Sequence, residues 1–282
     1  MEQATELPWL WAGLGAYALA TVTAFANNFR TRPERGGSLD LLPGQRIELS
    51  LLMAGILLLC VTLTVRWLRI GHGPFVNLFE LLISQLFSLG IVYSLIYWRW
   101  SAIRPASIVV LPIVWILGSW VLTLEPKAPP FPPTYYNPWL WAHVGAGKIF
   151  LGILLVATGL AGVLLLRRLD RLKPFFSRMP DDDTVDHLAW RLMVLALVFD
   201  SMMLVFGAVW AQDAWGRFWQ WDALETSAFL TWLSIGLGIH VRLAYRVPRT
   251  VTSAFIIVAF CLAFATYFST PFVSEAAHKG VI

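Results

Sequence analysis

The chain has 282 residues, of which 58% are hydrophobic and only 13% are charged, and its mean hydropathy is +0.67. Soluble domains are about a quarter charged, so this composition excludes an ordinary water-soluble protein. Apolar runs of about 20 residues recur, the length that a helix needs to cross a bilayer. We predict an all-α, polytopic membrane protein. The isoelectric point near 9.3 comes from arginines between the apolar runs, and we expect no nucleic-acid partner.

Eight apolar runs are long enough to span a membrane as helices. No internal repeat and no water-soluble domain interrupts them, so we predict a single transmembrane domain over residues 1–282. Within it, residues 9–70 carry less specific signals, and residues 71–282 contain the motifs described below. The predicted spans are residues 9–29, 49–68, 76–98, 105–124, 139–166, 188–211, 226–245 and 251–270.

Arginine and lysine residues concentrate in the connectors after the first, third, fifth and seventh spans. Cytoplasmic loops of membrane proteins are enriched in these residues. We therefore predict that these connectors are cytoplasmic and that both termini lie on the outer side, periplasmic or lumenal.

Four polar or aromatic segments fall on the predicted outer side, which indicates that the protein acts there. They are GHGPFVNLFE (71–80), YYNPWLWAHVG (135–145), WGRFWQWDALET (215–226) and the C-terminal SEAAHKGVI (274–282). The third of them, extended to residues 212–226, is called the tryptophan segment below.

The tryptophan segment interleaves Trp215, Trp219 and Trp221 with the charged residues Arg217 and Asp222. If the segment forms a short helix, Trp215, Trp219 and Asp222 share one face and Trp221 points elsewhere. One explanation is a belt of aromatic residues at the membrane surface. The other is a flat apolar ligand such as a porphyrin, which stacks on indole rings and pairs its carboxylates with Arg217.

Histidine is the usual axial ligand of porphyrin iron, and the chain has five histidines. His143 near the start of the fifth span and His278 in the C-terminal tail can both reach one metal on the outer side. His240 lies roughly 21 Å along the seventh span, too deep to share that metal. An ionisable residue at that depth indicates a functional role, although a packing role is the alternative. We expect His72 to be a turn residue and His187 to lie at a solvated helix start.

These segments resemble a known family. WGRFWQWDALET resembles the WWD signature of the haem-handling CcmF/CcmC/CcsA superfamily of cytochrome c assembly proteins. Its continuation, WDALETSAFLTWL followed by IHVRL, is similar to the CcsA (ResC) branch of system II and lacks the Arg-Leu-Thr-type stretch of the CcmC branch. GHGPFVNLFE resembles the Gly-x-x-Pro-x-x-Asn-x-x-Glu segment of the CcsA branch. The resemblance covers roughly residues 71–282.

The resemblance implies a role in cytochrome c synthesis. Proteins of this kind work with a CcsB (ResB)-type membrane partner, bring haem b to the outer side and attach it to the CxxCH motif of apocytochrome c. Thiol-reducing proteins keep the cysteines of that motif reduced. The implied location is a bacterial inner membrane or a thylakoid-type membrane.

The resemblance also implies roles for individual residues. His240 matches the intramembrane histidine that binds haem in transit, and the partner supplies a second one. His143 matches the external histidine before the WWD signature, and His278 the one after it, although HKGVI departs from the His-Ser-Tyr-Gly-like string of the family. The tryptophans of the segment, with Arg217 and Asp222, hold the ring. No catalytic acid or base is identified.

Three other classes of protein remain open from the sequence. A haem carrier of the CcmC kind binds haem and hands it to another assembly protein without forming thioether bonds. A regulator of the HemX kind shares the pattern of spans but is not expected to carry a WWD signature between histidines. A solute transporter with an aromatic belt binds no haem at all.

Overall fold

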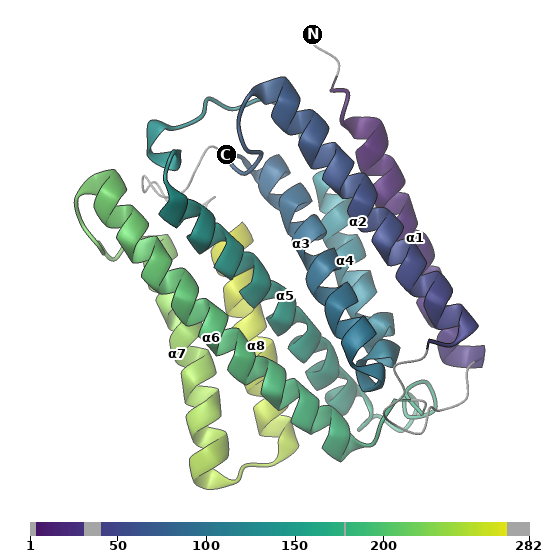
Figure 1. The fold of residues 1–282 in the computed structure, drawn as a ribbon. Helices are drawn as coiled ribbons and strands as arrows, with labels where there is room; N and C mark the ends of the chain where they lie inside the picture. The colour runs from purple at the N-terminus through teal and green to yellow at the C-terminus, as the bar shows by residue number, and fades with distance from the viewer. Residues whose placement is uncertain (1–3, 31–40, 178, 270–282) are drawn as a thin grey trace. The chain divides into compact units, whose positions relative to one another are not determined.

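The computed structural model describes residues 4–30, 41–177 and 179–269 (Figure 1). Over these residues the secondary structure is helical, without strands, and eight helices are long and apolar enough to cross a membrane. Each overlaps one predicted span, so the predictions of an all-α fold and of eight spans are confirmed. The chain divides into two compact units, residues 1–129 with 166–185 and residues 130–165 with 186–282.

The first unit is built from the first four long helices. The elements are α1 (Leu7–Arg30), α2 (Pro43–Ile70), α3 (Leu78–Arg99), the 3-10 helix η1 (Ser101–Ala106) and α4 (Ser107–Val121). Their apolar sides pack together, and the buried Tyr17 of α1 donates a hydrogen bond of 3.3 Å to the carbonyl oxygen of Leu86 in α3.

Helix α2 begins at Pro43, six residues before the predicted start of its span. The added turns contain Gln45 and Glu48, both buried. The amide of Asn27 donates to one oxygen of Glu48 over 3.0 Å, and the hydroxyl of Ser107 donates to the other. A buried polar group is tolerated when it is hydrogen-bonded. These partners therefore allow α2 to begin earlier in the chain than hydropathy alone predicts.

The second unit contains four long helices (Figure 1). The 3-10 helix η2 (Pro133–Tyr135) precedes α5 (Pro138–Leu166), and α6 (Asp182–Trp215), α7 (Ala223–Tyr245) and α8 (Arg249–Phe268) follow. At the end of the unit where α7 finishes, Arg242 makes a bidentate ion pair with Asp186 of α6, at 3.0 and 2.7 Å. The guanidinium also lies 4.6 Å from the ring centre of Trp190.

The acidic run before α6 both caps this helix and neutralises a basic residue. Asp181 accepts a hydrogen bond of 2.9 Å from the backbone N–H of Thr184, as a helix N-cap does. Asp182 forms an ion pair of 2.8 Å with Arg167. His187, in the second turn of α6, is exposed, in agreement with the solvated helix start predicted for it.

Candidate functional site

His143 lies in the second turn of α5, at the end of the second unit where the tryptophan segment joins α6 to α7; we call this the loop end. Its Nδ1 is 2.8 Å from the carbonyl oxygen of Met203 in α6. A carbonyl oxygen only accepts hydrogen bonds, so Nδ1 carries the proton and Nε2 keeps the lone pair. A histidine fixed by its other nitrogen in this way is the usual arrangement of a metal ligand.

Trp210, which the sequence analysis did not single out, holds the His143 ring from the side. The two rings stack with centres 6.2 Å apart and an interplanar angle of 25°. Trp210 is buried, and its Nε1 donates to the carbonyl oxygen of Thr134 over 3.0 Å. Trp210 lies at the end of an apolar run, so the composition of the run does not distinguish it from other membrane-spanning residues. Its spacing of seven residues from Met203 places both residues on one face of α6, and this spacing could have indicated Trp210 from the sequence.

Trp215 joins the tryptophan segment to this pair. It is the last residue of α6, and its ring centre lies 4.9 Å from that of Trp210. Close by, the amide of Asn137 donates to the carboxylate of Asp213 over 3.0 Å, which ties the start of α5 to the end of α6. The structure therefore brings His143 and Trp215, two predicted site residues, to one place through an indole between them.

The tryptophan segment does not form a short helix, so the condition for a shared helix face is not met. Helix α6 ends at Trp215 and α7 begins at Ala223, with non-helical backbone between them. Gly216 and Trp221 have φ angles of 73° and 61°, in the left-handed region that breaks a helix. Trp215, Trp219 and Asp222 consequently do not share a helix face.

Asp222 has a structural task at the start of α7. Its carboxylate accepts a 2.7 Å hydrogen bond from the backbone N–H of Glu225, and the buried Glu225 accepts from the backbone N–H groups of Gln220 and Asp222, at 2.8 and 3.4 Å. This reciprocal capping box fixes the path of the chain. Arg217, the predicted partner of a ligand carboxylate, is exposed.

The other two tryptophans of the segment join an aromatic cluster on α7. The ring centres of Trp219 and Trp221 are 5.7 Å apart, and Phe229 lies 6.3 and 6.0 Å from them. Trp221 is 66% exposed, whereas Trp219 is half-buried. The buried Nε1 of Trp219 has no hydrogen-bond acceptor within the described chain. The cluster thus offers an apolar surface, and beneath it the Nε1–H of Trp219 finds no acceptor among the described residues.

The remaining predicted ligands lie elsewhere. His240 is exposed on α7, seventeen residues after the first residue of that helix and about 26 Å from it along the axis. It is therefore well separated from the loop end, as the sequence predicts. His278 lies outside the described residues, so its proposed pairing with His143 stays a prediction.

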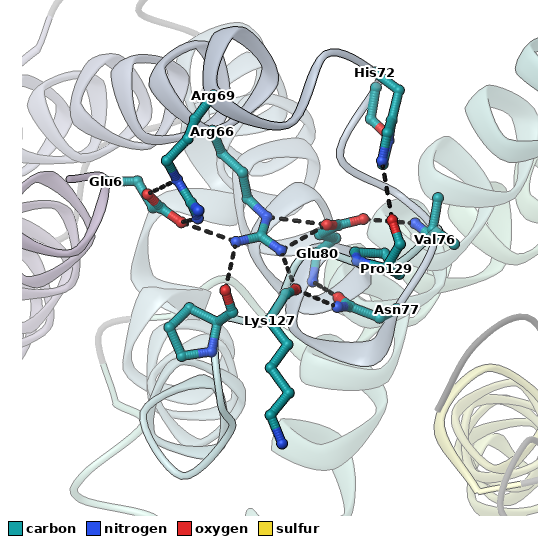
Figure 2. A network of polar contacts seen from close by, with 11 residues as sticks. Glu6, Arg66, Arg69, His72, Val76, Asn77, Glu80, Lys127 and Pro129 are labelled. Atoms are coloured by element: carbon teal, nitrogen blue, oxygen red, sulfur yellow. Dashed lines mark hydrogen bonds and ion pairs between the residues drawn. The ribbon is translucent and has the colours of Figure 1, made fainter. Parts of the chain in front are cut away.

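The segment GHGPFVNLFE forms a polar cluster in the first unit (Figure 2). Arg66 of α2, with no exposed side-chain surface, donates to Glu80 through Nε and Nη2 at 3.0 and 2.7 Å and to Glu6 over 2.8 Å. Arg69 also pairs with Glu6. Asn77 caps α3 by accepting from the backbone N–H of Glu80 over 3.0 Å.

The same cluster holds the connector after α4. Arg66 donates to the carbonyl oxygens of Pro126 and Lys127, at 3.2 and 2.6 Å, and Asn77 donates to the latter at 2.9 Å. Figure 2 shows that the Lys127 side chain points away from these groups. His72 has its two nitrogens 3.1 and 3.3 Å from the carbonyl oxygens of Gly73 and Pro129, in agreement with the predicted turn role.

Asp200 of α6 is a buried carboxyl group that the sequence analysis missed. It has no exposed surface, and neither of its oxygens has a hydrogen-bond partner within the described chain. It precedes Met203 by three residues and therefore lies one turn along the face of α6 that contacts His143. Among the described residues no cluster of three His, Cys, Asp or Glu could hold a metal ion.

Comparisons with known proteins identify the family of the chain. The family model for cytochrome C assembly proteins matches residues 49–278. The chain is 27% identical over 265 residues to the cytochrome c biogenesis protein CcsA of Chlamydomonas reinhardtii, covering 88% of this chain and 74% of that protein. It is 28% identical over 231 residues to CcsA of Prochlorococcus marinus, covering 69% and 71% of the two chains.

A solved structure shares the fold. The cytochrome c haem lyase CcmF superposes with a TM-score of 0.68 at 16% identity, over 95% of this chain. The chain spans about half the length of that lyase, 47% of it. The resemblance predicted from the tryptophan segment is confirmed by these matches. The chain is a multi-pass integral membrane protein that belongs to the cytochrome c assembly family and is of the CcsA type.

Proposed function

We propose that the chain is a subunit of a cytochrome c synthase that binds haem b and presents it at the loop end of the second unit. The observation that carries this proposal is the setting of His143, whose Nδ1 donates to Met203 and whose ring stacks on Trp210. Together they fix the orientation and the tautomer of the imidazole, as is usual for a histidine that serves as an axial ligand.

The residues around His143 fit a porphyrin. The indoles of the tryptophan segment supply flat apolar surface on which the macrocycle stacks. The Nε1–H group of Trp219 lacks an acceptor in the described chain, and Arg217 is exposed nearby in sequence. Both groups donate to carboxylates, and a haem propionate is such an acceptor. Asp222 and Glu225 act indirectly, because their capping box shapes the segment.

Thioether formation in this proposal depends on the positioning of haem and peptide and not on a catalytic acid. Each thiol of the CxxCH motif adds across a haem vinyl group: a C–S bond forms at one carbon, the other carbon gains the hydrogen, and no net oxidation occurs. A haem held by His143 and the tryptophan segment, beside a docked peptide, raises the effective concentration of the reacting groups. Reduced thiols come from thiol-reducing proteins.

His240 provides a second haem site in this proposal, at the opposite end of α7. The loop end faces the periplasm or lumen, and the end near Arg242 faces the cytoplasm, in a bacterial inner membrane or a thylakoid-type membrane. A CcsB (ResB)-type partner supplies the second ligand at His240, and His278 is the second ligand at the outer site. The distribution of arginine and lysine residues supports the orientation, and membership of the cytochrome c assembly family supports a role in handling haem.

The test is maturation of an apocytochrome c by this chain together with a CcsB-type partner. His143→Gly should lower the yield of covalent cytochrome, and added imidazole should restore part of it by filling the vacated ligand position. His187→Gly is the control, since His187 is exposed on α6. Unchanged yield in His143→Gly without imidazole contradicts the proposal. Bound haem that passes to another protein, with no thioether bond formed, identifies a haem carrier instead.

A further inference from the structure

Trp210 is the centre of the ring contacts around His143. The imidazole stacks on the indole of Trp210, and the ring of Trp215 lies edge-on to the same indole with centres 4.9 Å apart. Trp210 itself is only 2% exposed. A change in the plane of this indole therefore changes the surroundings of both the proposed ligand and the first residue of WGRFWQWDALET.

The stack supplies a restraint on His143 that the hydrogen bond to Met203 does not. That bond holds Nδ1 of the imidazole 2.8 Å from the carbonyl oxygen, but a ring can still turn about the axis of a single hydrogen bond. The indole of Trp210, inclined to the imidazole by only 25°, sets the plane of the ring. The orientation of His143 thus depends on what holds Trp210.

Two successive residues of η2 hold Trp210. The carbonyl oxygen of Thr134 accepts a hydrogen bond of 3.0 Å from Nε1 of the indole. The ring of Tyr135 makes a T-shaped contact with the indole, with centres 5.8 Å apart and an interplanar angle of 77°, an arrangement that aromatic pairs prefer. The first contact fixes the polar edge of the indole, and the second opposes a tilt of its plane.

The sequence FPPTYYNP (131–138) makes η2 a firm support for these contacts. Its prolines restrict the backbone φ angle, and the backbone N–H of Tyr135 donates to the carbonyl oxygen of Pro132 over 2.9 Å. On the other side of η2, the amide of Asn137 donates to Asp213 of α6 over 3.0 Å. Because η2 is held on both sides, Tyr135 has little freedom to move away from the indole.

The next residue, Tyr136, has different surroundings. It is 78% exposed, and its ring lies against Phe131 with centres 4.7 Å apart. Tyr135 is less exposed and lies against Trp210. The two adjacent tyrosines therefore form a matched pair, in which the ring of one supports the indole and the ring of the other faces outward.

We propose that Tyr135 is a positioning residue for haem binding, which acts through Trp210 to hold the His143 imidazole in one fixed orientation; the proposal rests on the function proposed above. A ligand that is already oriented binds iron more strongly, because it loses less freedom when the bond forms. When the ring of Tyr135 is removed, the indole can tilt and the imidazole can turn about its hydrogen bond. The iron then has a ligand of mixed orientation.

Tyr135→Leu tests the proposal, because leucine keeps apolar volume beside Trp210 but removes the ring. Tyr135→Phe retains the ring, and Tyr136→Leu is the matched control at the exposed neighbour. Trp210→Phe, which loses the N–H bond to Thr134, is a second disruptive variant in case Tyr135→Leu does not fold. Each variant is made in the full chain, coexpressed with the CcsB-type partner, beside His143→Gly. The readout is the EPR spectrum of the ferric haem, whose low-spin signal depends on the orientation of the axial imidazoles.

The signal that disappears in His143→Gly belongs to the outer site. This signal should shift and broaden in Tyr135→Leu and in Trp210→Phe, whereas Tyr135→Phe and Tyr136→Leu should match the wild type. An unchanged signal in the two disruptive variants overturns the positioning role, and so does an equal shift in Tyr136→Leu. An equal shift in Tyr135→Phe also overturns it, since the hydroxyl group and not the ring then acts. If no signal disappears in His143→Gly, the proposed function itself fails.

Discussion

Gly207 of α6 lies directly against the imidazole of His143. A Cβ built at residue 207 would be 2.6 Å from Nδ1 and 2.9 Å from Cε1 of that ring, closer than side-chain atoms approach one another. Glycine is therefore the residue that lets the ring reach the carbonyl oxygen of Met203, and a single methyl group at this position displaces the proposed ligand.

Gly207→Ala should accordingly weaken haem binding at the outer site, because the ring must move away from Met203 and lose its fixed orientation. The optical spectrum of the purified protein, compared with that of His143→Gly, which retains only the His240 site, measures this. Gly162→Ala in α5 is the control, since its Cβ meets no atom within 4 Å. Equal spectra for the two variants would show that the position of the ring does not depend on Gly207.

Arg66→Met should destabilise the protein strongly. It leaves Glu80 as a buried carboxylate without its guanidinium partner and leaves Glu6 with Arg69 alone, and breaking a buried ion pair in this way costs about 3–5 kcal/mol. Thermal unfolding in detergent measures the loss. Lys127→Ala should change stability by less than about 1 kcal/mol, because its exposed side chain pairs only at the surface while its carbonyl oxygen remains in place. Similar shifts in both variants would contradict a structural role for the cluster.

The same cluster predicts a pH dependence of stability. Burial by itself raises the pKa of Glu6, but the hydrogen bonds from Arg69 and Arg66 outweigh it and hold the pKa below its ordinary value. The stabilisation is therefore complete above the ordinary pKa of about 4.3 and is lost as the pH falls through the lowered value. Melting temperatures measured from neutral pH down to acidic pH should fall more steeply for the wild type than for Glu6→Gln. Parallel curves would refute this.

Asp222→Asn should retain most of the activity in cytochrome maturation, because the asparagine oxygen accepts the same N-cap hydrogen bond from Glu225. Asp222→Ala should lose the cap, at a cost of about 1 kcal/mol, and disturb the tryptophan segment. Cytochrome yield and melting temperature are measured for both variants. If Asn is as damaging as Ala to the yield, while its melting temperature stays normal, the carboxylate acts through its charge and not as a cap.

Asp200→Leu should leave the stability unchanged or raise it, because a buried carboxyl group that has no hydrogen-bond partner among the described residues is replaced by an apolar group with the same branching. Thermal unfolding gives the sign of the change. A lower melting temperature would reveal a stabilising partner of Asp200. A higher melting temperature together with a lower cytochrome yield would show that the carboxyl group is retained for function.

Hydropathy alone was enough to predict the eight spans, because a helix in a bilayer needs an uninterrupted apolar run. It placed the start of α2 too late, since Gln45 and Glu48 find hydrogen-bond partners inside the first unit. The short helix considered for the tryptophan segment does not form, because the backbone there is not helical. Spacing indicates a shared face only where the backbone stays helical, and Gly216 and Trp221 adopt left-handed angles there.

The sequence by itself determined the membrane class, the spans, the family and the residue types at the candidate site, because each depends on composition or on a contiguous motif. Only the tertiary structure decided that Trp210 stacks on His143, that Met203 selects its tautomer, and that Arg66 binds two distant glutamates. These contacts join residues that are far apart in the chain. The packing of the helices decides which of these residues come into contact, and the sequence alone does not show it.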